Sequence, residues 1–198
     1  TSPHLLRFNE RIREGGVDAS DAEIIAAFRD VDDVRGETSL TYFEFATLAA
    51  LLVFRARAVD VLVLEVGLGG RLDAVNIVDP TVAVITRIDL DHQAWLGSDR
   101  GSIAREKAGI LRRGVPAVLG DPEPPPELIE SAAASGSQPV LRLGREFGFE
   151  SRGDHWQGNL RGPNGLRALP LLPAAGPLKP ANICTGLQAA LLLGCEMS

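Results

Sequence analysis

The chain has 198 residues, of which 45% are hydrophobic and 23% are charged, proportions that are typical of a soluble globular protein. The formal net charge of -6 argues against a general binder of nucleic acid or of an anionic membrane, so we expect neither partner. Cys184 and Cys195 match no metal spacing and no disulfide framework, which favours a cytoplasmic location. The apolar run from Phe45 to Phe54 is too short to span a bilayer.

Two capping boxes predict helices in the first third of the chain. Ser20-Asp21-Ala22-Glu23 predicts a short helix that reaches about Asp30, and Thr41-Tyr42-Phe43-Glu44 predicts a longer helix that ends near Arg57. The second helix is apolar over most of its circumference, so we expect it to pack deep within the domain. Its N-terminus suits an anion, and Phe43 offers a ring for stacking, although such a phenylalanine is more often part of the core.

A glycine-rich turn follows the next apolar segment. Residues 59–64 are apolar except for Asp60 and do not alternate, which predicts a buried strand of a parallel sheet. Glu65 then stands at the carboxyl end of this strand, where open sheets bind their ligands, and the glycines after it allow close backbone approach. Pairing with a cation is an equally plausible role for Glu65. The turn lacks both the third glycine of a dinucleotide fingerprint and the lysine of a phosphate-binding loop.

A second strand, predicted over residues 81–86, also ends in potential metal ligands. Asp89, Asp91 and His92 follow it, and the intervening segment is long enough to make this strand a parallel neighbour of residues 59–64. Carboxylates suit Mg²⁺, whereas one imidazole keeps Mn²⁺ or Zn²⁺ open. The more common fate of a lone loop histidine is a simple hydrogen bond.

The remaining pattern completes an α/β fold, with a mostly parallel sheet flanked by helices and a small antiparallel β ribbon. Alternating aromatic residues and an Asn164-Gly165 turn signal predict the ribbon. Lys107 is expected to be solvated and paired with a carboxylate, and Asn182 lies in the first turn of the last helix. The predicted elements are a helix over 102–111 capped by Ser102, strands over 116–119 and 139–143, a helix over 127–134, the ribbon over 145–172, and a helix over 179–193.

Five blocks of residues, in this order, resemble the folylpolyglutamate synthase and dihydrofolate synthase family of the Mur-ligase superfamily. No single block is decisive, but the ordered set is highly specific. The blocks are Thr1-Ser2-Pro3-His4-Leu5 with Glu10-Arg11-Ile12; Leu40-Thr41-Tyr42-Phe43-Glu44; Glu65-Val66-Gly67-Leu68-Gly69-Gly70-Arg71-Leu72-Asp73-Ala74 with Asn76; Leu90-Asp91-His92 with Leu96-Gly97; and Arg105-Glu106-Lys107-Ala108-Gly109-Ile110.

The resemblance implies an ATP-dependent amide ligase that adds L-glutamate to dihydropteroate and to reduced folates through an acyl phosphate. It implies a fold like the central domain of Mur ligases and a monomer. Residues 1–198 would form part of the N-terminal ATP-binding domain, with an α/β core over 1–144, the ribbon over 145–172 and a returning helix over 173–198. The family's phosphate-binding loop would precede Thr1 and its C-terminal domain would follow Ser198, so we interpret the chain as a fragment that is inactive alone.

The resemblance also implies roles for individual residues. Ser2 and Glu65 would hold one Mg²⁺ near the ATP phosphates, and His92 would help to hold a second. Lys107 would be carbamylated, which turns a cation into a carboxylate-like group beside that second ion. Asn182 would contact adenine. Phe43 would stack on the pterin and Asp73 would accept a hydrogen bond from it, within two segments that contact dihydropteroate: Thr41, Tyr42, Phe43 and Glu44, and Leu72, Asp73 and Ala74.

Three alternatives stay open at this stage. A Mur-type ligase for a UDP-sugar peptide or another amino-acid polymer would share the metal chemistry but lack the two pterin segments. A dinucleotide-binding oxidoreductase is disfavoured because the glycine turn has no third glycine and no ribose-binding acid is evident. A non-catalytic binding module would show no metal binding and an unmodified Lys107.

Overall fold

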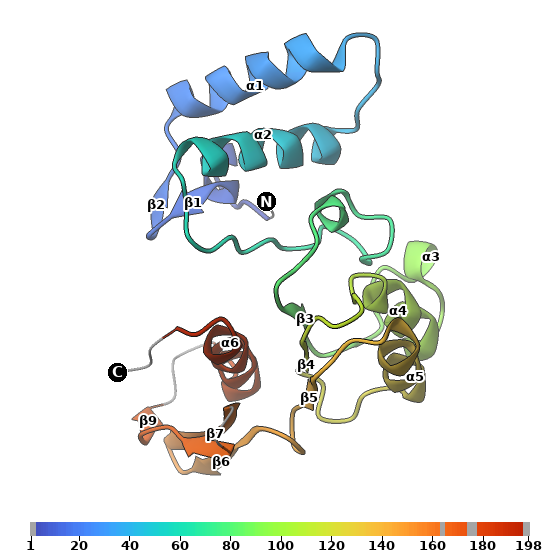
Figure 1. Ribbon diagram of the computed structural model, residues 1–198, viewed down its shortest axis with the longest axis vertical. Helices are drawn as coiled ribbons and strands as arrows, with labels where there is room; N and C mark the ends of the chain where they lie inside the picture. The colour runs from blue at the N-terminus through green and yellow to red at the C-terminus, as the bar shows by residue number, and fades with distance from the viewer. Residues whose placement is uncertain (1–2, 163–164, 174–177, 196–198) are drawn as a thin grey trace. The chain divides into compact units, whose positions relative to one another are not determined.

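The computed structural model describes residues 3–162, 165–173 and 178–195 of the chain (Figure 1). The chain divides into two compact units, Thr1–Val78 and Asp79–Ser198. This boundary falls inside the α/β core predicted over residues 1–144, and the predicted domain organisation itself stays a prediction. No helix in the described ranges has both the length and the apolar character needed to cross a membrane.

The first unit contains two long helices, one antiparallel pair of two-residue strands and two short 3-10 helices. Both helices begin at the predicted capping boxes, where the side chains of Ser20 and Thr41 accept hydrogen bonds from the backbone N–H groups of Glu23 and Glu44. The first helix runs beyond the predicted end, because Val31 still faces the core. The elements are η1 (Phe8–Arg11), β1 (Arg13–Glu14), β2 (Val17–Asp18), α1 (Asp21–Arg35), α2 (Tyr42–Ala56) and η2 (Ala74–Ile77).

The structure does not contain the strand predicted over residues 59–64, so this prediction is wrong. Residues 61–66 form no regular element, and the side chains of Val61 and Val63 are 51% and 81% exposed. An apolar strand needs a hydrogen-bonded neighbour and cover on both faces. Among the described strands none pairs with this segment, and β3 (Ala83–Ile85), its expected parallel neighbour, pairs with β4 (Ala117–Leu119) instead.

The second unit contains the predicted parallel sheet, with the strand order β3-β4-β5, where β5 is Val140–Arg142. Asp99, rather than Ser102, caps the central helix, which therefore begins two residues earlier than expected. The helices of this unit are α3 (Gln93–Leu96), α4 (Arg100–Ala108), α5 (Pro126–Ser135) and α6 (Pro180–Leu192).

Successive residues of the central strand β4 enter two different hydrophobic clusters. Ala117 and Leu119 pack with buried residues of α4 and α5, whereas Val118 packs with Trp156 and Cys184 on the other side. Side chains alternate across a strand, so both faces of the sheet are covered. Figure 1 shows α4 and α5 together beside the sheet, and α6 beside β6 (Gly148–Arg152) and β7 (His155–Gly162). The predicted α/β class is confirmed.

The predicted antiparallel ribbon is also confirmed. The long strand β7 pairs with β6, with β8 (Gly165–Ala168) and with the short β9 (Leu172–Pro173). Trp156 on β7 is 2% exposed and meets the ring of Phe149 edge-on, with 6.2 Å between the ring centroids. Asn164 of the predicted turn lies outside the described residues.

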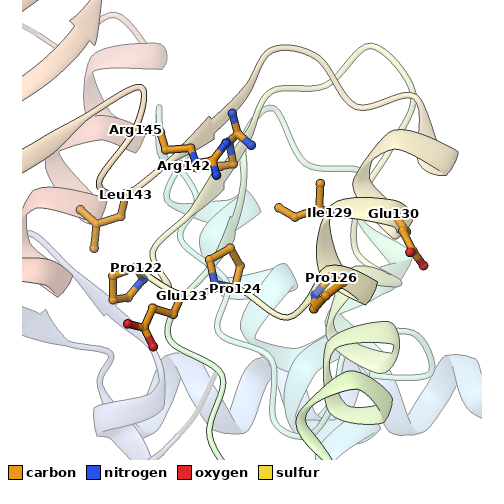
Figure 2. Close-up of a pocket in the computed structure, with 9 residues that line it drawn as sticks. All are labelled: Pro122, Glu123, Pro124, Pro126, Ile129, Glu130, Arg142, Leu143 and Arg145. Carbon is orange, nitrogen blue, oxygen red and sulfur yellow. The ribbon is translucent and has the colours of Figure 1, made fainter.

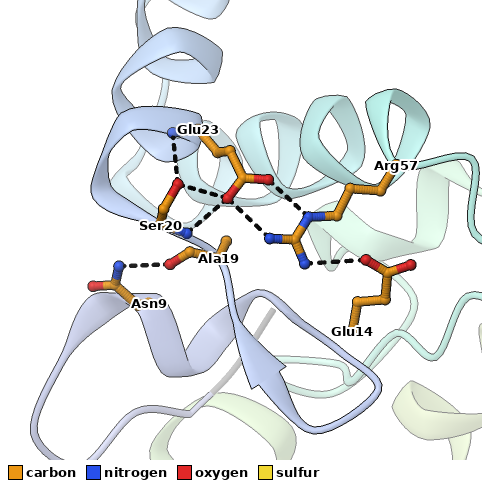
Figure 3. A network of polar contacts seen from close by, with 6 residues as sticks. All are labelled: Asn9, Glu14, Ala19, Ser20, Glu23 and Arg57. Atoms are coloured by element: carbon orange, nitrogen blue, oxygen red, sulfur yellow. Dashed lines mark hydrogen bonds and ion pairs between the residues drawn. The ribbon is translucent and has the colours of Figure 1, made fainter.

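An ion-pair network joins α1 to the end of α2 within the first unit (Figure 3). Both carboxylate oxygens of Glu23 accept hydrogen bonds from Arg57, through Nε and Nη2 at 2.9 Å each. Arg57 Nη1 also donates to Glu14 at 3.2 Å, and Ser20 donates to Glu23 from its N–H and its hydroxyl. The hydrogen bonds from Arg57, and then those from Ser20, lower the pKa of Glu23 to about 2.

This lowered pKa predicts a dependence of stability on pH. Because the pKa of Glu23 is about 2 in the folded chain and ordinarily 4.5, its contribution is fully present above pH 4.5 and is lost as the pH falls toward 2. Glu23→Gln should therefore lower the urea midpoint at neutral pH and flatten the decline between pH 4.5 and 2. The effect should be modest, because the pair contacts solvent.

The matched control is Glu150→Gln, which removes the exposed pair of Glu150 with Arg152 at 3.1 Å and should leave the pH profile unchanged. An equally steep acid decline in the original chain and in Glu23→Gln would contradict the assignment.

Candidate functional site

One carboxylate closes the glycine-rich turn of the first unit. Asp73 Oδ2 accepts hydrogen bonds from the N–H groups of Gly67 and Leu68, both at 3.0 Å. Its Oδ1 accepts a third from the N–H of Val75 at 3.0 Å, which caps η2. Gly69 lies within the closed turn at φ 69°, in the left-handed region that glycine adopts without strain. The residue predicted to bind the pterin therefore also organises its own loop.

The ring of Phe43 lies against the backbone of Gly67. A Cβ atom placed on Gly67 would stand 2.8 Å from Cζ of that ring, so the ring occupies the space that a side chain would take. Phe43 is in the first turn of α2, and Gly67 follows 24 positions later. Gly67 belongs to neither predicted pterin segment, but its N–H is bound by Asp73, so the contact links Phe43 to the second segment through one hydrogen bond.

Thr41 and Glu44 bind each other at the start of α2. Glu44 Oε2 accepts a hydrogen bond from the N–H of Thr41 at 2.7 Å, and Thr41 Oγ1 accepts one from the N–H of Glu44 at 3.2 Å. The hydrogen bonds from Thr41, the backbone one first, lower the pKa of Glu44. Both predicted contact residues therefore fix the helix N-terminus that carries Tyr42 and Phe43.

A small open cavity of about 350 Å³ lies beside this helix start. Tyr42 is 62% exposed, packs edge-on against Phe8 and carries the Arg11 guanidinium 5.6 Å from its ring centroid. The sequence analysis did not assign Arg35 or Ser39 to a site, and only their closeness to the capping box could have indicated them. The lining residues are Arg35, Ser39, Leu40, Thr41, Tyr42 and Phe45.

The predicted metal-associated residues are divided between the two units. Glu65 is exposed in the first unit, whereas His92 and Lys107 belong to the second. His92 is exposed at φ 51°, and its Nε2 lies 3.6 Å from Asp91 Oδ2. Lys107 is half-buried near the end of α4, and no carboxylate of the described residues forms an ion pair with it. Ser2 lies outside the described residues.

The donor types of these residues fit a divalent cation. Glu65, in the first unit, offers an exposed carboxylate of the kind that suits Mg²⁺, and His92, in the second unit, offers an exposed imidazole of the kind that suits Mn²⁺ or Zn²⁺. Within the part of the chain that the structure describes, no group of three His, Cys, Asp or Glu side chains is placed to hold an ion. The metal sites stay a prediction.

Of the other predicted contact residues, Leu72 and Asn182 are exposed and Ala74 is half-buried. Leu72 is 80% exposed in the turn, and Ala74 begins η2. Asn182 is exposed in the first turn of α6, in the second unit. Their predicted contacts with the pterin and with adenine stay predictions.

A larger open cavity, of about 600 Å³, lies at the carboxyl ends of β4 and β5 (Figure 2). In Figure 2 the two arginines stand across from Pro122 and Pro124, and Arg142 is held by Glu146 at 2.6 Å. None of these residues was predicted to belong to a site, although their place after two predicted parallel strands was a usable signal. The lining residues are Pro122, Glu123, Pro124, Pro126, Ile129, Glu130, Arg142, Leu143 and Arg145.

Comparison with known proteins gives a consistent result. No family model matches the chain. The chain is 44% identical over 199 residues to the dihydrofolate synthase/folylpolyglutamate synthase of Escherichia coli, an alignment that covers 100% of this chain and 46% of that protein. It is 35% identical over 202 residues to the folylpolyglutamate synthase of Lacticaseibacillus casei, covering 96% of this chain and 47% of that protein.

The chain is a homologue of the dihydrofolate synthase/folylpolyglutamate synthase family. It spans about half the length of the curated relatives that it matches.

Solved structures of this family share the fold. The E. coli enzyme FolC in complex with DHPP and ADP superposes with a TM-score of 0.92 at 43% identity, covering 100% of this chain and 46% of that one. The bifunctional enzyme of Yersinia pestis, complexed with AMPPNP and a Mn ion, gives a TM-score of 0.84 at 45% identity, with the same coverage of 100% and 46%. The predicted family and its fold are confirmed.

The clamp formed by Asp73 can be tested by amide exchange. Asp73→Ala removes the acceptor of three backbone N–H groups, so the amides of Gly67, Leu68 and Val75 should exchange faster. We expect about a 10-fold change, because each hydrogen bond to a charged group contributes roughly 1.5 kcal/mol or more.

Asp60→Ala is the control, since it removes an exposed carboxylate that lies after the end of α2 at Ala56 and before the turn. Unchanged exchange of Gly67 and Leu68 in Asp73→Ala would show that the turn closes without this carboxylate.

Proposed function

We propose that the full-length gene product containing this chain is an ATP-dependent ligase that adds L-glutamate to dihydropteroate and to reduced folates. The observation that carries the proposal is the contact of Phe43 with Gly67, whose N–H is bound by Asp73, so that residues of both predicted pterin segments lie around this glycine. Similarity to dihydrofolate synthase/folylpolyglutamate synthase along the whole chain supports the same reaction.

The reaction proceeds in two transfers. A carboxylate oxygen of the pterin substrate takes the γ-phosphoryl group of ATP, giving an acyl phosphate and ADP. The neutral amine of L-glutamate then attacks the acyl carbon, an amide bond forms, a proton leaves the nitrogen and inorganic phosphate departs. Such a reaction depends on positioning and on the neutralisation of phosphate charge.

The first unit supplies the substrate-binding groups. The half-buried ring of Phe43 stacks on the flat pterin, and the hydrogen-bonded Thr41–Glu44 pair holds the helix turn that presents it. Asp73 uses its remaining lone pairs to accept from the pterin while it closes the turn. Leu72, Ala74 and Tyr42 complete the contact surface.

The remaining predicted residues bind the metal ions and the adenine ring. Ser2 and Glu65 would hold one Mg²⁺ and His92 would help to hold a second; when bound, such an ion would neutralise phosphate charge. The neutral ε-amine of Lys107 would react with CO₂ and lose a proton, which gives an anionic carbamate that would help to hold the second ion. Asn182 contacts adenine from the first turn of α6. We expect a cytoplasmic monomer.

The decisive assay is phosphate release from ATP by the full-length gene product. Release that requires dihydropteroate, L-glutamate and Mg²⁺ together is the expected result. A purified full-length product that releases none would refute dihydropteroate as the substrate and favour a tetrahydrofolate or a Mur-type substrate. The 198-residue chain alone should release none, and turnover by a sample verified to contain only these residues would refute that expectation.

Carbamylation can be tested because the chain has only two lysines, Lys107 and Lys179. Equilibration with ¹³CO₂ should give a lysine carbamate signal by ¹³C NMR, separate from any signal of the N-terminal amine, which Lys107→Arg abolishes and Lys179→Arg retains. In the full-length product, Lys107→Arg should lower kcat at least about 100-fold, because a permanent cation repels the metal, whereas Lys107→Glu should retain part of the activity. Full activity of Lys107→Arg would contradict the role.

A further inference from the structure

The contact between Phe43 and Gly67 is closer than any side chain at position 67 would permit. A Cβ there would lie 2.8 Å from Cζ and 3.0 Å from both Cε1 and Cε2 of Phe43. Real Cβ atoms essentially never approach a heavy atom so closely, so a larger residue must displace the ring or the turn. Gly67 is not among the glycines with positive φ, so the ring alone, rather than backbone conformation, requires glycine here.

The backbone side of this contact is held more firmly than the ring side. The N–H of Gly67 is bound to Asp73 Oδ2 at 3.0 Å, and the N–H of Leu68 is bound to the same oxygen. On the other side, Phe43 lies in the helix turn fixed by the Thr41–Glu44 capping box. Displacement of the Gly67 backbone therefore costs hydrogen bonds to a charged group, whereas rotation of the ring costs less.

We propose that Gly67 is a positioning residue, which sets the plane and depth of the Phe43 ring and thereby the affinity for the pterin that stacks on it. The inference rests on the proposed function, which assigns the stacking role to Phe43. Gly67 itself need not touch the substrate. Because stacking depends on offset and ring separation, a small displacement of the ring weakens it.

The test is Gly67→Ala in the full-length gene product. A stacked aromatic pair contributes to the binding free energy, so a loss of alignment should raise KM for dihydropteroate about 3- to 10-fold. KM for ATP, KM for L-glutamate and kcat should stay within error, because the change lies in substrate binding alone. An unchanged KM for dihydropteroate would overturn the proposal.

Gly148→Ala is the matched control. Gly148 also lacks a positive φ, and a Cβ on it would meet its nearest neighbour, the backbone nitrogen of Gly144, at an ordinary 3.7 Å. This variant should leave every kinetic constant unchanged, which separates the effect of the ring from that of adding a methyl group to any glycine.

A double-mutant cycle separates positioning from a general disturbance of the turn. In a Phe43→Ala background the ring is gone, so Gly67→Ala should raise KM for dihydropteroate no further. An equal rise in both backgrounds would show that the methyl group acts on the turn and not through Phe43, and would overturn the proposal.

A measurement without substrate keeps this inference distinct from the proposed function. A ring seated on Gly67 shifts its Hα protons upfield in the NMR spectrum, and Phe43→Leu should abolish that shift. A shift that is absent from the original protein would overturn the contact itself. A shift that is present, in a full-length product that releases no phosphate with dihydropteroate, would leave the contact standing and overturn its role in pterin binding.

Discussion

The candidate site depends on a single carboxylate that satisfies three backbone N–H groups. Asp73 accepts hydrogen bonds from the N–H groups of Gly67, Leu68 and Val75. These bonds fix the conformation of a turn that has no regular secondary structure. The carboxylate thus supplies the acceptors that a strand or a helix supplies elsewhere, and it holds the turn in one conformation. These hydrogen bonds fix the position of Gly67, and the ring of Phe43 packs against this glycine.

The same residues serve structure and substrate in this region. Thr41 and Glu44 hold the first turn of α2, and Asp73 holds the glycine turn. Phe43 belongs to the first of these turns, and its ring contacts the second. Under the proposed function each of them also faces the pterin. A site built in this way is pre-organised, because the groups that contact the ligand are fixed before it arrives.

The second unit shows how a short parallel sheet is stabilised. Its strands have three residues each, yet the alternating side chains of β4 enter one cluster with α4 and α5 and another with α6 and the ribbon. The ribbon and α6 therefore cover a face of the sheet that water would otherwise reach. The cavity at the ends of β4 and β5 follows from the same topology, since loops open where parallel strands end.

The sequence by itself determined the local structure and the family. Capping boxes at Ser20 and Thr41 placed the starts of α1 and α2, because their signals lie within four residues, and the ordered motifs pointed to folate ligases. Only the tertiary structure decided that residues 61–66 form no strand, that Phe43 meets Gly67, and that Asp73 binds its own turn. Each of these three features depends on a partner distant in the chain or on the path of the backbone. An apolar pattern in the sequence predicts neither of them.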